Sequence, residues 1–516
     1  MPRLLRWLLL TAAAVLVAVL LARSWFVPAD PVGRAPVSAI AASGETPLGR
    51  LMLAGSAAHP GRSGVLALRD PRDALASRLA LIEAARVSID VQYYIWHADA
   101  SGSLLLAALL DAAQRGVRVR LLLDDIGVSG MDGLLAALDA QPNVEVRLFN
   151  PSLVRRPKLI SYLFDFARMN RRMHNKALIA DGAAAIVGGR NIGDEYFQVG
   201  QGVFFHDLDV LATGAVIAET SAAFDAYWNS RSVLDVDHVL DKGPGLRDLR
   251  RRLDEITRSA DAEALRKDPT ISSRRYAAGE LPLEWTRVRL VVDDPAKGHG
   301  EVDRSRLMIA QLGRLLGDMD RSLDLVSAYF VPAGAGLDYL TGLRSQGRRV
   351  RVLTNAMSAT DVLVVHAGYA KFRRDLLRAG VELFELKPFG PDTRISEQQV
   401  QPLGISGASL HTKAFALDRD RIFIGSFNFD PRSALFNCEM GFLIESSSMA
   451  ERMAQAFGDR MLEASYQPRL WADGTMVWDE PMADGSVRTH QTEPGTRAWQ
   501  RAVMAALAWL PIEWLL

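Results

Sequence analysis

The stretch RMHNKALIAD (172–181) contains one of only eight lysines in a chain that has 52 arginines. A second stretch, LHTKAFALD (410–418), repeats its H-x-K-x4-D frame: His411, Lys413 and Asp418 correspond to His174, Lys176 and Asp181. Each stretch is followed by a similar tail, GGRN (188–191) in the first case and GSFN (425–428) in the second. The occurrence of the same motif and the same tail at two places in the chain indicates an internal duplication.

The segments before the two motifs also repeat. A β-branched and aromatic run, a stretch with helical spacing that ends at glycine and a second apolar run predict a strand, a helix and a strand in each half. These are RVSIDVQYYIW (86–96), LLLAALLDAAQRG (104–116) and VRVRLLLDD (117–125), then RSLDLVSAYFVP (321–332), LDYLTGLRSQG (337–347) and RRVRVLTN (348–355). Alternating strands and helices favour an α/β fold, with a parallel or mixed sheet flanked by helices in each half.

Bulk composition limits the class of protein. A chain of 516 residues with 49% apolar residues is long enough for two lobes with their own cores. The formal net charge is zero, so no global field favours nucleic acid as a partner. The single cysteine, Cys438, excludes an intrachain disulfide and a cysteine-based zinc site, and its predicted role is that of a small buried side chain.

The N-terminus predicts a membrane anchor. Residues 1–26 contain two arginines followed by an uncharged run from Trp7 to Ala22, which is short for a span but is extended by Arg23 and two interfacial aromatic residues. A cleaved signal peptide is the alternative, although no clear small-x-small site closely follows the run. Positive charge before the run places the body of the protein outside the cytoplasm, whereas Arg23 weakens this bias.

The remaining boundaries follow from composition. We expect a Pro/Ala/Gly/Ser-rich tether, a first lobe, a charged helical linker, a second lobe and a C-terminal tail, over residues 27–60, 61–242, 243–284, 285–470 and 471–516. In the tail, Trp499, Trp509 and Trp514 punctuate an apolar segment. It favours a helix that docks on a membrane, with a packed terminal helix as the alternative.

The residue types of the motifs suit phosphodiester chemistry. On a strand, residues two apart point to one face, so His174 and Lys176 share a face, as do His411 and Lys413. Histidine can act as nucleophile or proton donor near neutral pH, and lysine neutralises a phosphoryl oxygen. Asn191 and Asn428 add neutral donors, so these groups can supply what a metal ion would, and we expect neither a metal nor another cofactor.

Paired motifs with G-[GS]-x-N tails resemble the phospholipase D superfamily over nearly all of the chain after about residue 60. The segments VQYYIWHADASG, VGGRNIGDEYF, NAMSATDVLVVHAGYAKFRRDLL and LPIEWLL narrow the resemblance to the C-type bacterial cardiolipin synthases. It implies two similar lobes with the active site at their interface. It also implies a phosphohistidine, with one histidine as nucleophile and the other as general acid and then base. By analogy His174 is the nucleophile and His411 the acid, although the internal symmetry leaves the order open.

Further roles complete the expected site. The resemblance implies a carboxylate that holds each imidazole, and we assign Asp209 and Glu439, without deciding which histidine each contacts. Asp181 and Asp418 are interpreted as structural supports within the motifs. Basic residues crowd the approach to His174 and predict a site for an anionic lipid headgroup. The substrate-binding residues we expect are Arg171, Arg172, Gly188, Gly189, Gly425 and Ser426.

The function expected from the resemblance is a phosphatidyltransferase that makes cardiolipin at the bacterial inner membrane, with its catalytic body on the periplasmic side. Its substrates would be phosphatidylglycerol and, as an option, phosphatidylethanolamine. A phospholipase D that uses water as the acceptor keeps the same site. A nuclease of the superfamily is disfavoured by the zero net charge and the apolar anchor, and a noncatalytic scaffold by two complete motifs. The sequence leaves the acceptor and the oligomeric state open.

Overall fold

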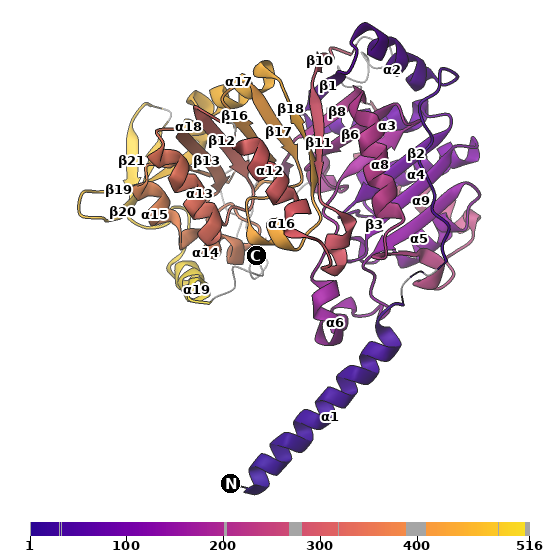
Figure 1. Cartoon of the computed structure of the whole chain (residues 1–516), viewed down its shortest axis with the longest axis horizontal. Coiled ribbons are helices and arrows are strands. Elements are labelled where there is room, and N and C mark those ends of the chain that lie inside the picture. Colours follow the sequence, from indigo (N-terminus) through magenta and orange to yellow (C-terminus); the bar gives the residue numbers. More distant parts are fainter. Residues whose placement is uncertain are drawn as a thin grey trace.

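The computed structural model describes residues 2–29, 31, 33–200, 204–267, 281–317, 319–388, 409–482 and 484–510. Two α/β lobes lie side by side, and one long helix near the N-terminus projects away from them (Figure 1). Each lobe is built on one large mixed sheet that is flanked by helices.

The first lobe contains a nine-stranded sheet. In sheet order its strands are β10 (Glu284–Thr286), β1 (Ser63–Leu68), β8 (Asp209–Gly214), β6 (Ala184–Gly188), β5 (Ala177–Ala180), β2 (Ser88–Tyr93), β3 (Arg118–Asp124), β4 (Val144–Phe149) and β9 (Val233–Asp235). Its helices include α3 (Pro71–Ala84), α4 (Ala100–Gln114), α5 (Asp132–Asp139), α6 (Tyr162–Met169), α7 (Asp194–Phe197), α8 (Val216–Trp228), α9 (Leu246–Thr257) and α10 (Ala260–Lys267).

The second lobe contains a ten-stranded sheet. Its strands, in sheet order, are β11 (Val288–Val292), β18 (Met440–Ile444), β17 (Arg421–Gly425), β16 (Lys413–Leu417), β12 (Ser322–Ser327), β13 (Arg349–Asn355), β14 (Glu382–Leu386), β19 (Ser465–Leu470), β20 (Met476–Pro481) and β21 (Val487–His490). Its helices include α12 (Met308–Leu316), α13 (Ala333–Ser345), α14 (Leu363–Ala370), α15 (Arg373–Arg378), α16 (Pro431–Leu435), α17 (Ser447–Ala456) and α18 (Asp459–Ala464).

The two sheets repeat one topology. The order β1-β8-β6-β5-β2-β3-β4-β9 in the first lobe matches β11-β18-β17-β16-β12-β13-β14-β19 in the second. In each lobe the three strands of the strand–helix–strand region pair in parallel, and the hairpin that carries the motif joins them antiparallel. This shared topology confirms the predicted duplication and the predicted fold class.

The lobes are held together by an apolar core and by backbone pairing. One cluster of buried side chains contains Met173, Ala177 and Ile179 from the first motif together with Cys438 and Met440 from the second lobe. Short strands β7 (Phe205–His206) and β15 (Ser409–Leu410) pair in parallel across the lobes. Both motifs therefore lie where the lobes meet.

The N-terminal region is more ordered than a tether. Helix α1 (Pro2–Phe26) has 25 residues, so it is about 37 Å long and exceeds a hydrocarbon core of about 30 Å. After it, the backbone N–H groups of Val37 and Ala39 donate to Asn229 and Asp225 of the first lobe, and α2 (Pro47–Ala58) follows. The prediction of a flexible tether over 27–60 is therefore wrong, because this segment binds the lobe surface.

Two other predicted boundaries differ from the structure. Strands β20 and β21 extend the second sheet past residue 470. Strand β10 straddles the predicted boundary between residues 284 and 285 and belongs to the first sheet. In the charged linker, α9 buries Leu249 and Leu253 in the first core.

Helix α19 (Ala498–Ala508) packs on α14, with Trp499 48% and Trp509 90% exposed. Trp514 lies outside the described residues, so docking on a membrane stays a prediction.

Candidate active site

The two motif histidines occupy equivalent places just before a central strand of each sheet. His174 precedes β5 and His411 precedes β16. The N–H of His174 donates to the carbonyl of Cys438 at 2.8 Å, and the N–H of His411 donates to the carbonyl of His206 at 2.8 Å. Each histidine is thus placed by backbone contact with the opposite lobe.

Each imidazole is held by a carboxylate from the opposite lobe. Nδ1 of His174 donates to Oε2 of Glu439 at 2.8 Å, and Nδ1 of His411 donates to Oδ2 of Asp207 at 2.5 Å. The histidines are only 7% and 6% exposed. Because a bond at Nδ1 fixes the ring tautomer, Nε2 of each ring is the atom available for chemistry. Neither motif histidine is therefore paired with a carboxylate of its own lobe.

The prediction that Asp209 contacts a motif histidine is wrong. Asp209 is fully buried and pairs with Arg78 at 2.9 Å and with Arg190 at 2.6 Å. The sheet register explains the difference: Gly188 pairs with Asp209 in the first lobe, as Gly425 pairs with Gly441 in the second. Two residues before each partner stand Asp207 and Glu439. Aligning HDLDV with CEMGF would have identified Asp207 from the sequence.

The environment of the two carboxylates differs. Burial acts to raise the pKa of both groups. For Glu439, the neighbouring His174 and Lys176 and a hydrogen bond from Ser426 outweigh burial, so its pKa lies below the usual value. For Asp207, burial outweighs Lys413 and Arg190, so its pKa lies above the usual value. Glu439 is therefore the more firmly ionised partner.

The motif lysines lie beside their histidines in the interior. Nζ of Lys176 donates to the carbonyl of His174 at 2.6 Å, and Lys413 makes the same bond to His411. Burial lowers the pKa of Lys413 to about 8 and that of Lys176 well below the usual value. Burial likewise lowers the pKa of His174 to about 4 and that of His411 well below the usual value. A phosphate anion between these groups would raise the pKa of each, and would so favour charged lysines and a protonated His411.

The two motif asparagines are not equivalent. Asn191 is engaged: its amide donates to the hydroxyl of Tyr196 at 2.9 Å and its carbonyl accepts from the N–H of Ile95 at 3.2 Å. Asn428 is 3% exposed, and its Oδ1 has no hydrogen-bond partner in the described part of the chain. A buried, unpaired amide oxygen costs free energy unless a ligand bonds it. Asn428 is therefore the asparagine that is free to contact a ligand.

The motif aspartates stand at the hairpin turns, away from the imidazoles. Asp181 accepts hydrogen bonds from the N–H groups of residues 86–88, and Asp418 accepts them from residues 320–322. Both residues have positive φ, 50° and 53°, next to these turns. They hold the start of a neighbouring strand, which agrees with the interpretation as structural supports.

The predicted glycine and serine positions pack against the carboxylates and the strands. A Cβ on Gly188 would lie 2.2 Å from Oδ1 of Asp209, and one on Gly189 would lie 2.2 Å from Oδ1 of Asp207. A Cβ on Gly425 would lie 2.4 Å from the carbonyl oxygen of Met440. The hydroxyl of Ser426 donates to Oε2 of Glu439 at 2.5 Å. These residues shape the site, and their contact with substrate stays a prediction.

The predicted basic approach to His174 is largely neutralised within the protein. Arg172 is buried and pairs with Asp124 at 2.7 Å, so it has a structural role inside the first lobe. The prediction that it contacts substrate is therefore wrong. Arg171 lies half-buried over the ring of Phe436. Other members of the basic run are paired as well: Arg155 with Asp125 and Asp132, Lys158 with Asp125, and Arg168 with Asp165.

Aromatic side chains that the sequence reasoning did not single out surround the histidines. Tyr94 meets His174 edge-on with ring centroids 5.0 Å apart, and its centroid lies 5.4 Å from Nζ of Lys176. Tyr196 and Phe205 each lie 5.2 Å from the ring of His411. Tyr94 lies in the run that predicts the first strand (86–96), directly after the observed β2, and Tyr196 follows the GGRN tail. The signal available in the sequence was that these aromatic residues stand beside the repeated segments.

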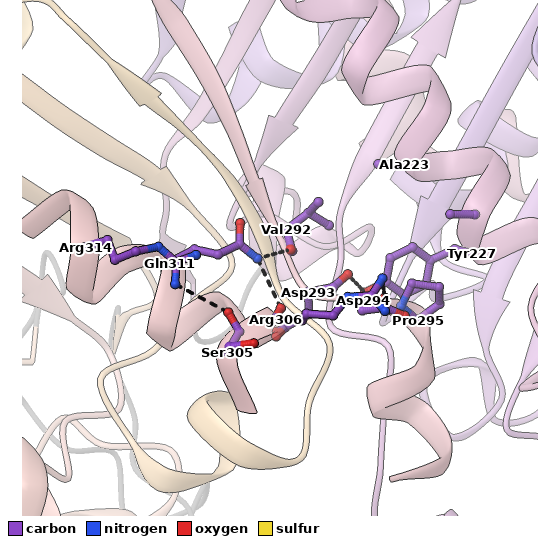
Figure 2. A pocket seen from close by; sticks show the side chains of 11 residues that line it. Ala223, Tyr227, Val292, Asp293, Asp294, Pro295, Ser305, Arg306, Gln311 and Arg314 are labelled. Atoms are coloured by element: carbon purple, nitrogen blue, oxygen red, sulfur yellow. Dashed lines mark hydrogen bonds and ion pairs between the residues drawn. The ribbon is translucent and has the colours of Figure 1, made fainter. Parts of the chain in front are cut away.

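Two other features lie apart from the histidines. Ligand atoms of His97, Asp99 and Glu195 lie within 4.8 Å of one another and form the one group of metal-ligating geometry found in the described residues. A groove of about 400 Å³ lies between α8 and the segment 292–314 (Figure 2). The groove lining includes Tyr227, Asp293 and Arg306, and no motif residue belongs to either feature.

Comparison with known proteins adds the family. A family model described as cardiolipin synthase, PLD-like domain, matches residues 79–228 and again residues 312–462. Cardiolipin synthase C of Escherichia coli (strain K12) is 45% identical over 469 residues, which cover 89% of this chain and 97% of that protein. An uncharacterized protein of Helicobacter pylori (strain ATCC 700392 / 26695) is 31% identical over 472 residues, covering 89% and 90%. The crystal structure of phosphatidylserine synthase from Haemophilus influenzae Rd KW20 is 14% identical, with a TM-score of 0.49 over 81% of this chain and 91% of that chain.

Proposed function

The chain belongs to the cardiolipin synthase family of phospholipase D-like phosphatidyltransferases, and we propose that it makes cardiolipin from two phospholipid molecules. The acceptor is phosphatidylglycerol, whose free headgroup alcohol receives the phosphatidyl group of a second phosphatidylglycerol or of a phosphatidylethanolamine. The observation that carries this proposal is the pair of buried histidines, each held at Nδ1 by a carboxylate of the opposite lobe.

The proposed reaction has two displacements. Nε2 of His174 attacks the phosphorus of the donor, and the phosphorus–oxygen bond to the headgroup breaks. His411 protonates the departing alkoxide, which leaves as glycerol when the donor is phosphatidylglycerol. The acceptor alcohol then gives its proton to His411 while its oxygen displaces His174 from phosphorus. Glu439, which accepts the hydrogen bond from Nδ1 of His174, would stabilise the positive imidazole of the intermediate.

The lysines and Asn428 would neutralise and orient the phosphoryl oxygens. Lys176 and Lys413 flank the histidines and are 1% exposed, so their charges would act in a medium poor in water. Both histidines are also almost fully buried, which disfavours water as the acceptor relative to an alcohol that binds in place. This burial favours a transferase over a phospholipase D.

The proposed location is the bacterial inner membrane, with the lobes on the periplasmic side. Helix α1 is long and apolar enough to cross a bilayer, and Arg3 and Arg6 precede its apolar part. Exposed Trp499 and Trp509 on and beside α19 would provide a second contact with the headgroup region. A reporter enzyme that is active only in the periplasm, fused after residue 510, should be active, and activity of a cytoplasm-dependent reporter there would contradict this topology.

Product analysis tests the function. The purified chain, in vesicles of phosphatidylglycerol with and without phosphatidylethanolamine, should convert phosphatidylglycerol to cardiolipin and release glycerol. Phosphatidate as the main product would make the protein a hydrolase. Cardiolipin formed equally well by the double variant His174→Ala/His411→Ala would assign the reaction to a contaminant and leave the proposal without support.

A further inference from the structure

The segment before the first motif exposes an unusual number of large apolar side chains. Leu159 and Ile160, in the short helix Lys158–Ser161, are 68% and 43% exposed, and Leu163 and Phe166 of α6 are 78% and 44% exposed. We call these four residues the α6 patch. Four such residues within eight positions are more than the scattered apolar residues of an ordinary surface.

The base of α1 packs directly beside the α6 patch. The guanidinium of Arg23 donates to the carbonyl of Phe164 at 2.8 Å, and the rings of Phe26 and Phe164 lie 6.1 Å apart. The segment after α1 is bound to the first lobe, so the helix does not emerge from a loose tether. Figure 1 shows α6 on the side of the lobes from which α1 projects, and α2 on the opposite side. A bilayer that contains α1 would therefore meet the α6 patch.

The same segment leads into the active site. Helix α6 ends at Met169, five residues before His174. Arg432 of α16 donates to Oδ1 of Asn170 at 2.8 Å and joins the second lobe to this rim.

Three of the basic residues around the patch are neutralised within the protein, whereas Arg156 is exposed. Arg155, Lys158 and Arg168 are occupied by internal carboxylates. Leu435, at the end of α16, is 45% exposed and adds an apolar side chain from the second lobe. The rim before His174 thus presents apolar side chains, which suit acyl chains better than headgroups.

We propose that the α6 patch inserts into the acyl-chain region of the bilayer that holds α1, and that the donor lipid passes over it to the histidines. The second part rests on the proposed phosphatidyl transfer, whereas insertion does not. Insertion would place the active-site rim at the level of the phosphate groups, so a lipid would need to rise only slightly from the bilayer to react.

Site-directed fluorescence tests insertion without any use of activity. The only cysteine, Cys438, is buried, and burial raises the pKa of its thiol to about 12, so it should resist labelling at neutral pH. Leu163→Cys would carry an environment-sensitive fluorophore in the full-length chain, in phosphatidylglycerol vesicles. Leu51→Cys is the matched control, because Leu51 is 63% exposed on α2. The label at 163 should be quenched by lipids with a nitroxide on the acyl chain, and the label at 51 by aqueous iodide. Iodide quenching at both positions would overturn the proposal.

A kinetic comparison tests the access route. The variant Leu159→Ser/Leu163→Ser/Phe166→Ser should lose about tenfold of its activity on vesicles but less than about twofold in mixed detergent micelles, where the lipid reaches the site without a bilayer. The control Leu51→Ser/Leu53→Ser should lose activity in neither. Equal losses in vesicles and micelles would contradict lipid passage over the patch.

A second copy of the chain is the other possible occupant of the patch. In that case the serine variant would change from an oligomer to a monomer in detergent, and acyl-chain nitroxides would not quench the label at 163. That result would overturn insertion. Insertion without cardiolipin formation would instead contradict the proposed function alone.

Discussion

The two halves of the site are alike in topology and unlike in their contacts. In one, His174 is bound by Glu439, which also accepts a hydrogen bond from Ser426. In the other, His411 is bound by Asp207, and Tyr196 and Phe205 pack against the ring. A duplicated motif has thus acquired two environments. The difference indicates that the two halves act in different steps of one reaction. The variants described below test this division of roles.

The largest expected effects come from the histidines. His174→Ala and His411→Ala should each lower turnover by about 10⁴-fold or more, because each removes a group that no neighbour replaces. Initial rates of cardiolipin formation measure this loss. Thermal unfolding should show that both variants remain folded. Near-normal turnover in either variant would show that its imidazole takes no part in the chemistry.

Replacing the two aspartates of HDLDV should have different effects, one on turnover and the other on stability. Asp207→Asn should lower turnover by about 10²- to 10⁴-fold with little loss of stability, since an amide can hold the wrong imidazole tautomer. Asp209→Asn should instead lower the free energy of unfolding by about 3–5 kcal/mol, because it leaves Arg78 and Arg190 buried with less charge to balance them. Kinetics and thermal unfolding of both variants provide the test. The reverse pattern would return Asp209 to the catalytic role.

The asparagines should show a smaller asymmetry. Asn428→Ala should lower kcat/KM by about 10²-fold, since it removes an amide whose Nδ2 would donate to a phosphoryl oxygen. Asn191→Ala should act mainly by releasing Tyr196 from its hydrogen bond, with an effect of about tenfold or less. Tyr196→Phe removes the same bond from the other side. If Asn191→Ala were the more damaging variant and Tyr196→Phe had no effect, Asn191 would contact the substrate.

The smallest effect concerns pH. Burial places the pKa of Lys413 at about 8 in the free protein. Its charged form is present below this pKa and is lost as pH rises through it, so kcat/KM should fall above about pH 8. Lys413→Arg retains its charge in this range and should remove the alkaline decline while lowering the maximum rate. An unchanged alkaline limb in this variant would assign the decline to another group.

The sequence predicted the features that recur. The H-x-K-x4-D frames, the strand–helix–strand order and the meeting of the motifs between two lobes are all confirmed. Asp209 was chosen over Asp207 within HDLDV. The spacing from the motif could not decide between them, because the loop between β6 and β8 is longer than its counterpart between β17 and β18. The register of β6 with β8 resolves this offset.

Other features needed the structure because they depend on partners distant in the chain. From the sequence, the charge of Arg172 was expected to be free for substrate binding. In the structure it is paired with Asp124, which lies 48 residues earlier in the chain. Residues 27–60 looked like a tether because their composition carries no signal of the contacts that Val37 and Ala39 make with α8 and the residue after it. The difference between Asn191 and Asn428 likewise arises from Tyr196, a neighbour that only one half contains.

The identity of the phosphorylated histidine is the most direct test of the proposed division of roles between His174 and His411. Phosphatidylglycerol labelled at its phosphate would be mixed with the wild-type protein and with the two histidine variants, and the reaction quenched in base within one turnover. If His174 is the nucleophile, label should appear on His174 in the wild-type protein and in His411→Ala, and none should appear in His174→Ala. Label on His411 in the wild-type protein, retained in His174→Ala, would reverse the roles of the two halves, and the absence of a base-stable label from all three proteins would contradict the covalent mechanism.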